Sequence, residues 1–259
     1  MDFYNHVKPK DFEQRLREGM VDTLNEVIRS RFPDATIQPF GSFMTGLYLP
    51  TGDMDLVLCS KSYINTGRPK YHTKKLLYQF SGHLQALDMT FRDEVEIVSK
   101  ARVPLVKYID STTGLKVDIS FENTTGVGAI QTFLDWKAQY PAMPMLVTIV
   151  KHFLTMRGLN EPVNGGIGGF SVICLVVSML QLIPQVQSRD LVPEHHLGEM
   201  LMHFFDLYGN KFNYETTAIR LNPPAYIPKA SPFSPRVPNP RIKLPSFDLR
   251  TWRCHPRRR

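Results

Sequence analysis

PFGSFMTGLYLPTGDMDLVL, residues 39–58, is the stretch of this chain that decides its fold. Gly41 and Ser42 follow a strand-like segment. Asp53 and Asp55 then lead into an apolar strand, and because residues i and i+2 of a strand point to the same side, they aim two carboxylates at one point. Neighbouring carboxylates repel unless a cation lies between them, and Mg²⁺ prefers carboxylate oxygens combined with substrate phosphate. The stretch therefore predicts a strand that starts at a magnesium site.

A third carboxylate strengthens this interpretation against its alternative, an ordinary solvated Asp-x-Asp loop. Asp118 lies inside the apolar segment LKVDISF (115–121), where aspartate is disfavoured. Its own alternative is an exposed strand face. The backbone of Gly41 and Ser42 can in addition cradle a phosphate through N–H groups. Three carboxylates on adjacent strands beside a phosphate cradle are what two-metal nucleotidyl transfer requires.

The apolar spacing around this stretch predicts an α+β module followed by a helical module. Residues 10–32 have the periodicity of one long helix with Phe12, Leu16 and Met20 on its apolar face, and we expect it to pack on the helical module. Strands are predicted at 36–40, 54–59, 94–99, 103–110, 115–121 and 217–221. Helices are predicted at 73–87, 127–140, 144–158, 170–183 and 197–209.

Composition and charge limit the class of protein. Hydrophobic residues make up 42% and charged residues 21% of the 259, which are globular values. The three cysteines are far apart in sequence, so we expect a reducing compartment and no zinc knuckle. We expect neither a signal peptide nor a membrane span, because no apolar run is long enough.

The C-terminal part of the chain differs from the rest. Residues 222–259 hold nine of the 31 Lys and Arg, one acidic residue and nine of the 20 prolines. Residues 1–221 therefore carry a net charge of −1, and the basic character of the protein belongs to the tail. We expect the folded part to end near Lys229.

Taken together, these motifs resemble the nucleotidyltransferase superfamily of DNA polymerase β. Within it, the chain is similar to the non-canonical poly(A) polymerases of nuclear RNA surveillance, the catalytic subunits of TRAMP-type complexes, over roughly residues 3–228. Further stretches carry the likeness: VDISFENTTG (117–126), VKHFLTMRGLNEPVNGGIGGFSVICLVVSMLQ (150–181) and LGEMLMHFFDLYGNKFNYE (197–215). After residue 228 the expected DP…ND-type motif of that family is missing, which leaves a weakened helical domain as one expectation.

The resemblance implies an α+β fold: a polymerase-β-like palm with a mixed sheet and flanking helices, plus a helical central domain. The palm would be residues 33–125, and the central domain residues 1–32 with 126–228. Residues 229–259 would be a disordered, basic, proline-rich tail. The implied activity is template-independent addition of AMP from ATP to RNA 3′ ends in polyadenylation-assisted decay, by two-metal catalysis with Mg²⁺, or Mn²⁺ as the alternative.

The resemblance also assigns site residues. Asp53 and Asp55 would bind both metals, and Asp118 would complete the site and help to deprotonate the RNA 3′-hydroxyl. Gly41 and Ser42 would hold the triphosphate.

Four more residues are carried over from the helical part and its approach. Gly126 would let the backbone approach the nucleotide, and Lys151 would reach the phosphates, with a surface lysine as its alternative. Gly169 and Phe170 stand where the family has Ser-Tyr; Phe170 would stack on the base or, alternatively, be a core aromatic. His196 replaces a family asparagine and would either read a base edge or cap a helix.

The implied partners are an RNA 3′ end, ATP, a zinc-knuckle RNA-binding protein and an RNA helicase, with no membrane. The implied location is the nucleus, or more narrowly the nucleolus. Two alternatives stay open: a terminal uridylyltransferase, and a catalytically impaired scaffold of a surveillance complex.

Overall fold

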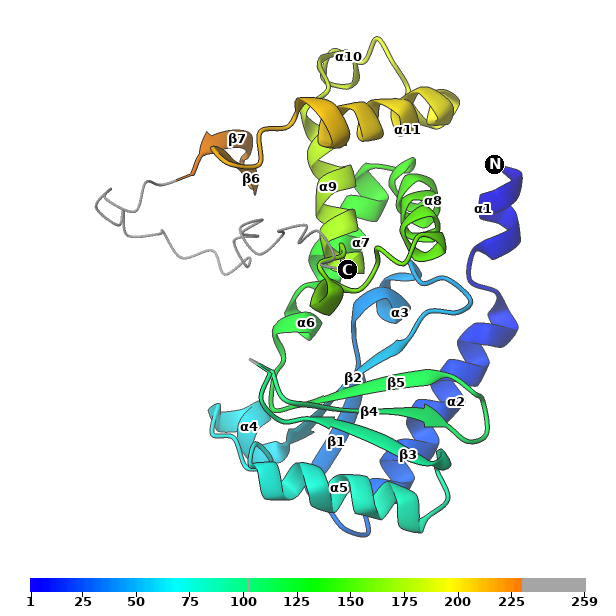
Figure 1. Ribbon diagram of the computed structural model, residues 1–259, viewed down its shortest axis with the longest axis vertical. Helices are drawn as coiled ribbons and strands as arrows, with labels where there is room; N and C mark the ends of the chain where they lie inside the picture. Colours follow the sequence, from blue (N-terminus) through cyan, green and yellow to red (C-terminus); the bar gives the residue numbers. More distant parts are fainter. Residues whose placement is uncertain (102, 230–259) are drawn as a thin grey trace, which may run out of the picture. The chain divides into compact units, whose positions relative to one another are not determined.

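The computed structural model describes residues 1–101 and 103–229, which divide into two compact units (Figure 1). One unit comprises residues 5–133. The other comprises residues 1–4 together with the chain from residue 134 onward. Within the described ranges, every helix is too short or too polar to cross a bilayer.

The first unit is built on a five-stranded mixed sheet with the order β1-β2-β5-β4-β3. Its strands are β1 (Ala35–Pro39), β2 (Met54–Ser60), β3 (Thr90–Val98), β4 (Leu105–Asp110) and β5 (Lys116–Phe121). β2 and β5 run parallel, and the other neighbouring pairs are antiparallel. Each strand overlaps a predicted one, and the mixed sheet with flanking helices confirms the predicted α+β class.

Two long helices, α2 (Asp11–Ile28) and α5 (Lys74–Ala86), pack against one face of this sheet (Figure 1). The ring of Phe80 on α5 lies 5.3 Å from that of Phe121 on β5 and 5.8 Å from that of Phe32, which follows α2. Short helices occupy the connections: α3 (Gly41–Thr45), α4 (Lys61–Thr66) and α6 (Thr125–Gly128). The opposite sheet face is left for the polar side chains described below.

The position of α2 corrects a prediction. The helix was expected to belong to the helical module, but Met20, Leu24 and Ile28 are buried in the core of the sheet. Phe12 and Leu16, predicted on the buried face, are 64% and 47% exposed. The buried stripe fits the apolar side of the sheet, so α2 belongs to the palm unit, which runs over residues 5–133 rather than 33–125.

The second unit is mainly helical. Its long helices are α7 (Ile130–Gln139), which starts in the first unit, α8 (Met143–Met156), α9 (Gly169–Leu182) and α11 (Leu197–Asp206). The shorter elements are α1 (Asp2–Val7), at the boundary of the two units, η1 (Pro162–Asn164), α10 (Pro184–Gln187), η2 (Pro193–His195) and η3 (Leu207–Lys211). Residues 172–181 of α9 are all buried, so α9 is the central helix of this unit.

A hairpin of β6 (Thr217–Leu221) and β7 (Pro224–Pro228) packs against α9. β7 was not predicted, because prolines stand at both of its ends. A two-stranded hairpin tolerates them, since an edge strand does not need every N–H for pairing. The backbone N–H of Lys229 donates to the Thr216 carbonyl at 2.7 Å, so residue 229 is still tied to the hairpin. The rest of the predicted disordered tail, residues 230–259, lies outside the described residues.

Candidate active site

Asp55 and Asp118 lie opposite each other in the register of the parallel strands β2 and β5. Their neighbours in sequence, Met54 and Leu56 on β2 and Val117 and Ile119 on β5, are 0% exposed and form the core. Alternation therefore sends both carboxylates to the sheet face opposite α2 and α5. The structure thus places these two predicted site residues side by side, and their role as metal ligands stays a prediction.

Asp53 is half-buried and stands one residue before β2. It therefore lies at the strand's entrance, next to the loop that links α3 to β2. This is the predicted position, at the start of the strand, although Asp53 itself is not part of the ladder.

Gly41 packs directly on Asp55. Its φ is +68°, a conformation that favours glycine, and a Cβ there would lie 2.6 Å from Oδ2 of Asp55. The amide of Phe40, one residue earlier, donates to the Asp55 carbonyl at 3.0 Å. The Gly-Ser turn therefore holds both the backbone and the carboxylate of Asp55 at close range.

Lys107 is a site residue that the sequence reasoning missed. It lies on β4 opposite Asp118, and its Nζ is 2.6 Å from Oδ2 of Asp118. The two side chains are 38% and 22% exposed, so the ion pair is only partly in water. The sequence did contain a signal for Lys107: it is a charged residue between two buried neighbours of a strand, Val106 and Tyr108. Asp118 was predicted from the same pattern. The Lys107 ammonium group therefore supplies a positive charge next to the carboxylate pair.

The donor set fits a hard divalent cation in kind. Carboxylate oxygens are what Mg²⁺ and Mn²⁺ prefer, and Gly41 keeps the space beside Asp55 free of a side chain. Among the described residues, however, no three His, Cys, Asp or Glu side chains already converge in a metal-binding arrangement. The structure presents a carboxylate pair in register with a lysine, and the completion of the site by Asp53 stays a prediction.

Gly126 lies on α6 and supports the same turn from another side. A Cβ at this position would fall 2.3 Å from the ring of Phe40, the residue before Gly41. The sequence analysis expected the backbone at Gly126 to approach the nucleotide. In this structure it approaches the ring of Phe40. Ser42, the other member of the predicted phosphate cradle, is half-buried at the start of α3, and its carbonyl accepts from the Leu47 amide at 2.9 Å.

Lys151, Gly169 and Phe170 come together in the second unit. A Cβ on Gly169 would lie 3.5 Å from Nζ of Lys151, so the ammonium on α8 sits beside the start of the 14-residue helix α9. Phe170 is 37% exposed, which excludes the alternative of a core aromatic. The action of Lys151 and Phe170 on a bound nucleotide stays a prediction.

His196 precedes α11 at the capping position. In the described chain its imidazole makes no capping hydrogen bond; instead, Nδ1 lies 3.3 Å from Oε2 of Glu199, with 49% of the side chain exposed. The helix-cap alternative is therefore not supported at the side chain.

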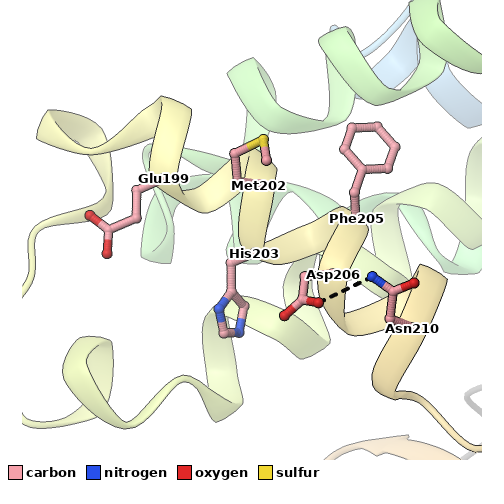
Figure 2. Close-up of a pocket in the computed structure, with 6 residues that line it drawn as sticks. All are labelled: Glu199, Met202, His203, Phe205, Asp206 and Asn210. Atoms are coloured by element: carbon pink, nitrogen blue, oxygen red, sulfur yellow. Dashed lines mark hydrogen bonds between the residues drawn. The ribbon is translucent and has the colours of Figure 1, made fainter.

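A pocket of about 500 Å³ lies on one face of α11, and none of the predicted site residues lines it (Figure 2). It is lined by Glu199, Met202, His203, Phe205, Asp206 and Asn210. Asn210 donates to Asp206 at 3.2 Å across it. Neither Asp55 nor Asp118 is among its lining residues. The candidate catalytic site is therefore the carboxylate pair on the sheet, not this pocket.

Family models match both parts of the chain. A model described as "Poly(A) RNA polymerase, mitochondrial-like, central palm domain" matches residues 1–134, more than half of the sequence. The chain belongs to the non-canonical poly(A) RNA polymerases. A second model, "Cid1 family poly A polymerase", matches residues 196–241. The first match ends near the boundary between the two units, and the second continues past residue 228, where the resemblance was expected to stop.

Individual relatives agree with the family. Poly(A) RNA polymerase protein 2 of Saccharomyces cerevisiae is 36% identical over 96% of this chain and 44% of its own length. A solved structure of the polymerase core of TRAMP, a RNA surveillance complex, is 36% identical, with a TM-score of 0.78, over 88% of this chain and 68% of that chain.

One of the similar proteins is named as inactive. The inactive non-canonical poly(A) RNA polymerase protein Trf4-2 of Drosophila melanogaster is 34% identical over 82% of this chain and 50% of its own length. The chain spans half or less of these curated relatives, so family membership alone does not decide its activity.

Proposed function

We propose that this chain is a polynucleotide adenylyltransferase that adds AMP from ATP to the 3′ end of RNA without a template. The observation that carries the proposal is the in-register pair Asp55 and Asp118 with Gly41 packed on Asp55. This pair occurs in a chain of the poly(A) RNA polymerase family. The proposed cofactor is Mg²⁺, with Mn²⁺ as the alternative, held by Asp53, Asp55 and Asp118.

The reaction forms a bond between the RNA 3′ oxygen and the α-phosphorus of ATP and breaks the bond to pyrophosphate. Mg²⁺ held by these carboxylates would lower the pKa of the attacking hydroxyl and neutralise charge on the triphosphate. Asp118 helps to take up the hydroxyl proton at its carboxylate. Lys107 holds Oδ2 of Asp118 at 2.6 Å and so fixes the orientation of that carboxylate.

Nucleotide recognition is proposed for the other residues that the family resemblance assigns. Gly41 and Ser42 would hold the triphosphate through the backbone, with Lys151 as a further charge for the phosphates. Phe170, 37% exposed, offers a ring face on which a purine can stack. His196 would read the base edge. Its replacement of the family's asparagine is the reason to keep UTP as the rival substrate.

The proposed setting is nuclear RNA surveillance. Its support is the likeness to the polymerase core of TRAMP and the charge distribution. Residues 1–221 carry a net charge of −1, which favours few phosphate contacts and weak RNA affinity. A zinc-knuckle RNA-binding protein and an RNA helicase are the proposed partners that deliver the substrate, in the nucleus or nucleolus.

The test is extension of a 5′-labelled oligo(A) primer with each of the four nucleoside triphosphates, with and without Mg²⁺. We expect Mg²⁺-dependent extension with ATP and a lower kcat/KM with UTP. Asp22→Ala, which changes an exposed aspartate on α2, is the matched control and should extend like the wild type. Equal kcat/KM for ATP and UTP would contradict the adenylyl assignment, and extension with none of the four would favour the scaffold that the inactive relative exemplifies.

A further inference from the structure

Arg17 is the largest side chain buried almost completely in the described chain, with 1% of its surface exposed. It lies on α2, between the exposed Leu16 and the core residue Met20. A buried guanidinium is costly unless its donors are satisfied. The contacts of Arg17 therefore indicate what its burial achieves.

The side-chain hydrogen bonds of Arg17 go to one loop. Nη1 donates to the carbonyl of Gly52 at 3.1 Å and Nη2 donates to that of Pro50 at 3.2 Å. The guanidinium carbon also lies 4.4 Å from the centre of the Tyr48 ring. Arginine is suited to this arrangement, because its planar fork can donate to two carbonyls while its face stacks on an aromatic ring.

This loop leads directly to the candidate site. Residues 46–52 connect α3, which begins with the Gly41 that packs on Asp55, to Asp53. The Gly52 amide donates to the Leu49 carbonyl at 2.7 Å, and a Cβ on Gly52 would lie 2.9 Å from that oxygen. The turn is therefore tight, and its last carbonyl, held by Arg17, belongs to the peptide bond to Asp53.

The charge of Arg17 also acts on the loop and the site. Burial lowers the pKa of Arg17, and the negative charges of Glu13 and Asp53 oppose that shift. Arginine nevertheless remains protonated at neutral pH, because its reference pKa is so high. A positive charge is therefore held next to the loop that leads to Asp53.

A second polar side chain on α2 fixes the other end of the same segment. Asn25 accepts from the Ile37 amide at 2.8 Å and donates to the Ile37 carbonyl at 3.0 Å, which ties α2 to β1. Asn25 stands about two turns from Arg17. α2 therefore holds both the strand that leads into Gly41 and the loop that leaves it.

We propose that Arg17 is a positioning residue that fixes the loop before Asp53 and thereby sets the approach of the Asp53 carboxylate to Asp55 and Asp118. This inference rests on the proposed function, because it concerns the same metal-binding carboxylates. It differs from a merely structural role of Arg17 in stabilising α2, which would affect stability without a specific effect on cation affinity.

The test compares Arg17→Met and Arg17→Lys with two controls. Arg15→Met removes an exposed arginine of the same helix, and Leu24→Ala removes a core side chain of the same helix. Three readouts are used: Mn²⁺ affinity by electron paramagnetic resonance without ATP or RNA, hydrogen exchange of residues 46–55, and kcat and KM for ATP.

Arg17→Met should weaken Mn²⁺ binding and lower kcat by about 10- to 100-fold, the usual effect of losing a residue that orients a metal ligand. KM for ATP should change little, and exchange at residues 46–55 should increase. Arg17→Lys, which keeps the charge but not the fork, should recover part of the affinity. Arg15→Met should behave like the wild type, and Leu24→Ala should lose thermal stability while keeping Mn²⁺ affinity.

Wild-type exchange at residues 46–55 together with wild-type Mn²⁺ affinity in Arg17→Met would overturn the inference. Equal losses in Leu24→Ala and Arg17→Met at matched stability would also overturn it. If Arg17→Met fails to fold, Arg17→Lys decides by the same criteria. A wild-type protein that binds Mn²⁺ but adds no nucleotide would instead overturn the proposed function and leave the exchange readout to judge Arg17.

Discussion

At the scale of residues, short contacts surround Asp55 and Asp118 and define the candidate site. Both aspartates could be predicted as site residues from the sequence, because a carboxylate within an apolar strand is a local pattern. Lys107 and Arg17 were missed, because their roles come from partners 11 and 33 to 35 residues away. Contacts of that kind depend on register and on helix docking, which local spacing does not define.

Gly41→Ala tests the close approach to Asp55. The added Cβ would meet Oδ2 of Asp55 at 2.6 Å, so we expect kcat to fall by about 100-fold, since small misplacements at a reacting centre have effects of that order. Gly114→Ala is the matched control. Gly114 has nearly the same φ, +70°, but nothing within 4 Å of its Cβ position. Both variants should lose about 1–2 kcal/mol of unfolding free energy, measured in urea; equal kcat in the two would contradict the prediction.

Lys107→Gln tests the ion pair with Asp118. Removal of the ammonium 2.6 Å from Oδ2 should lower kcat by about tenfold or more, because the carboxylate loses the group that orients it. Lys116→Gln, at an exposed position on β5, should leave kcat unchanged. Steady-state primer extension measures both, and a Lys107→Gln variant with the wild-type kcat would show that the ion pair is incidental.

At the scale of elements, the sequence located the strands and long helices but not the docking of α2. Periodicity shows that a helix has an apolar face, yet it does not say which neighbour covers that face. The buried face of α2 contains Arg17 and Met20 instead of the predicted Phe12 and Leu16. Two polar side chains hold the helix in this orientation, because Arg17 and Asn25 hydrogen-bond the backbone of the sheet unit. Hydrophobic periodicity treats Arg17 and Asn25 as exposed residues because they are polar, so it predicts the wrong face.

A pair of substitutions on α2 tests this buried face. Met20, 5% exposed, and Leu16, 47% exposed, are one turn apart and had been predicted on the same buried side. Met20→Ala should cost about 2–5 kcal/mol of unfolding free energy, as core truncations do. Leu16→Ala should cost less than about 1 kcal/mol. Urea denaturation measures both, and the reverse order would place α2 the other way round.

At the scale of the whole molecule, the predicted succession of an α+β part and a helical part is present, but the boundary is not where it was predicted. The palm unit gains α2 and extends to residue 133. The hairpin strand β7 was hidden by its terminal prolines, and the short helices α3, α4 and α6 are too brief to show a period. Under the proposed function, RNA has to bind a chain whose residues 1–221 carry a net charge of −1.

Deletion of residues 230–259 tests the contribution of the basic tail, which holds eight of the 31 basic residues. Each phosphate contact adds about 0.7 to the slope of log K against log salt for single strands. A tail that makes three or four contacts should therefore flatten the slope by about 2–3 on deletion, while kcat at saturating RNA stays unchanged. Binding isotherms at several salt concentrations measure this, and an unchanged slope would exclude the tail as an RNA-binding element.

The most direct test of the central claim is the kcat for AMP addition by Asp55→Asn and Asp118→Asn, measured at saturating ATP, Mg²⁺ and oligo(A). These changes keep the shape of the in-register pair and remove its charge. We expect each to lower kcat by more than about 1,000-fold, equivalent to about 4 kcal/mol of transition-state stabilisation. Asp55→Asn should keep or raise thermal stability, because it removes a repulsion between like charges, whereas Asp118→Asn also gives up the ion pair with Lys107 and should not gain stability. Retention of more than about a tenth of the wild-type kcat by either variant would contradict the claim that this carboxylate pair carries the chemistry.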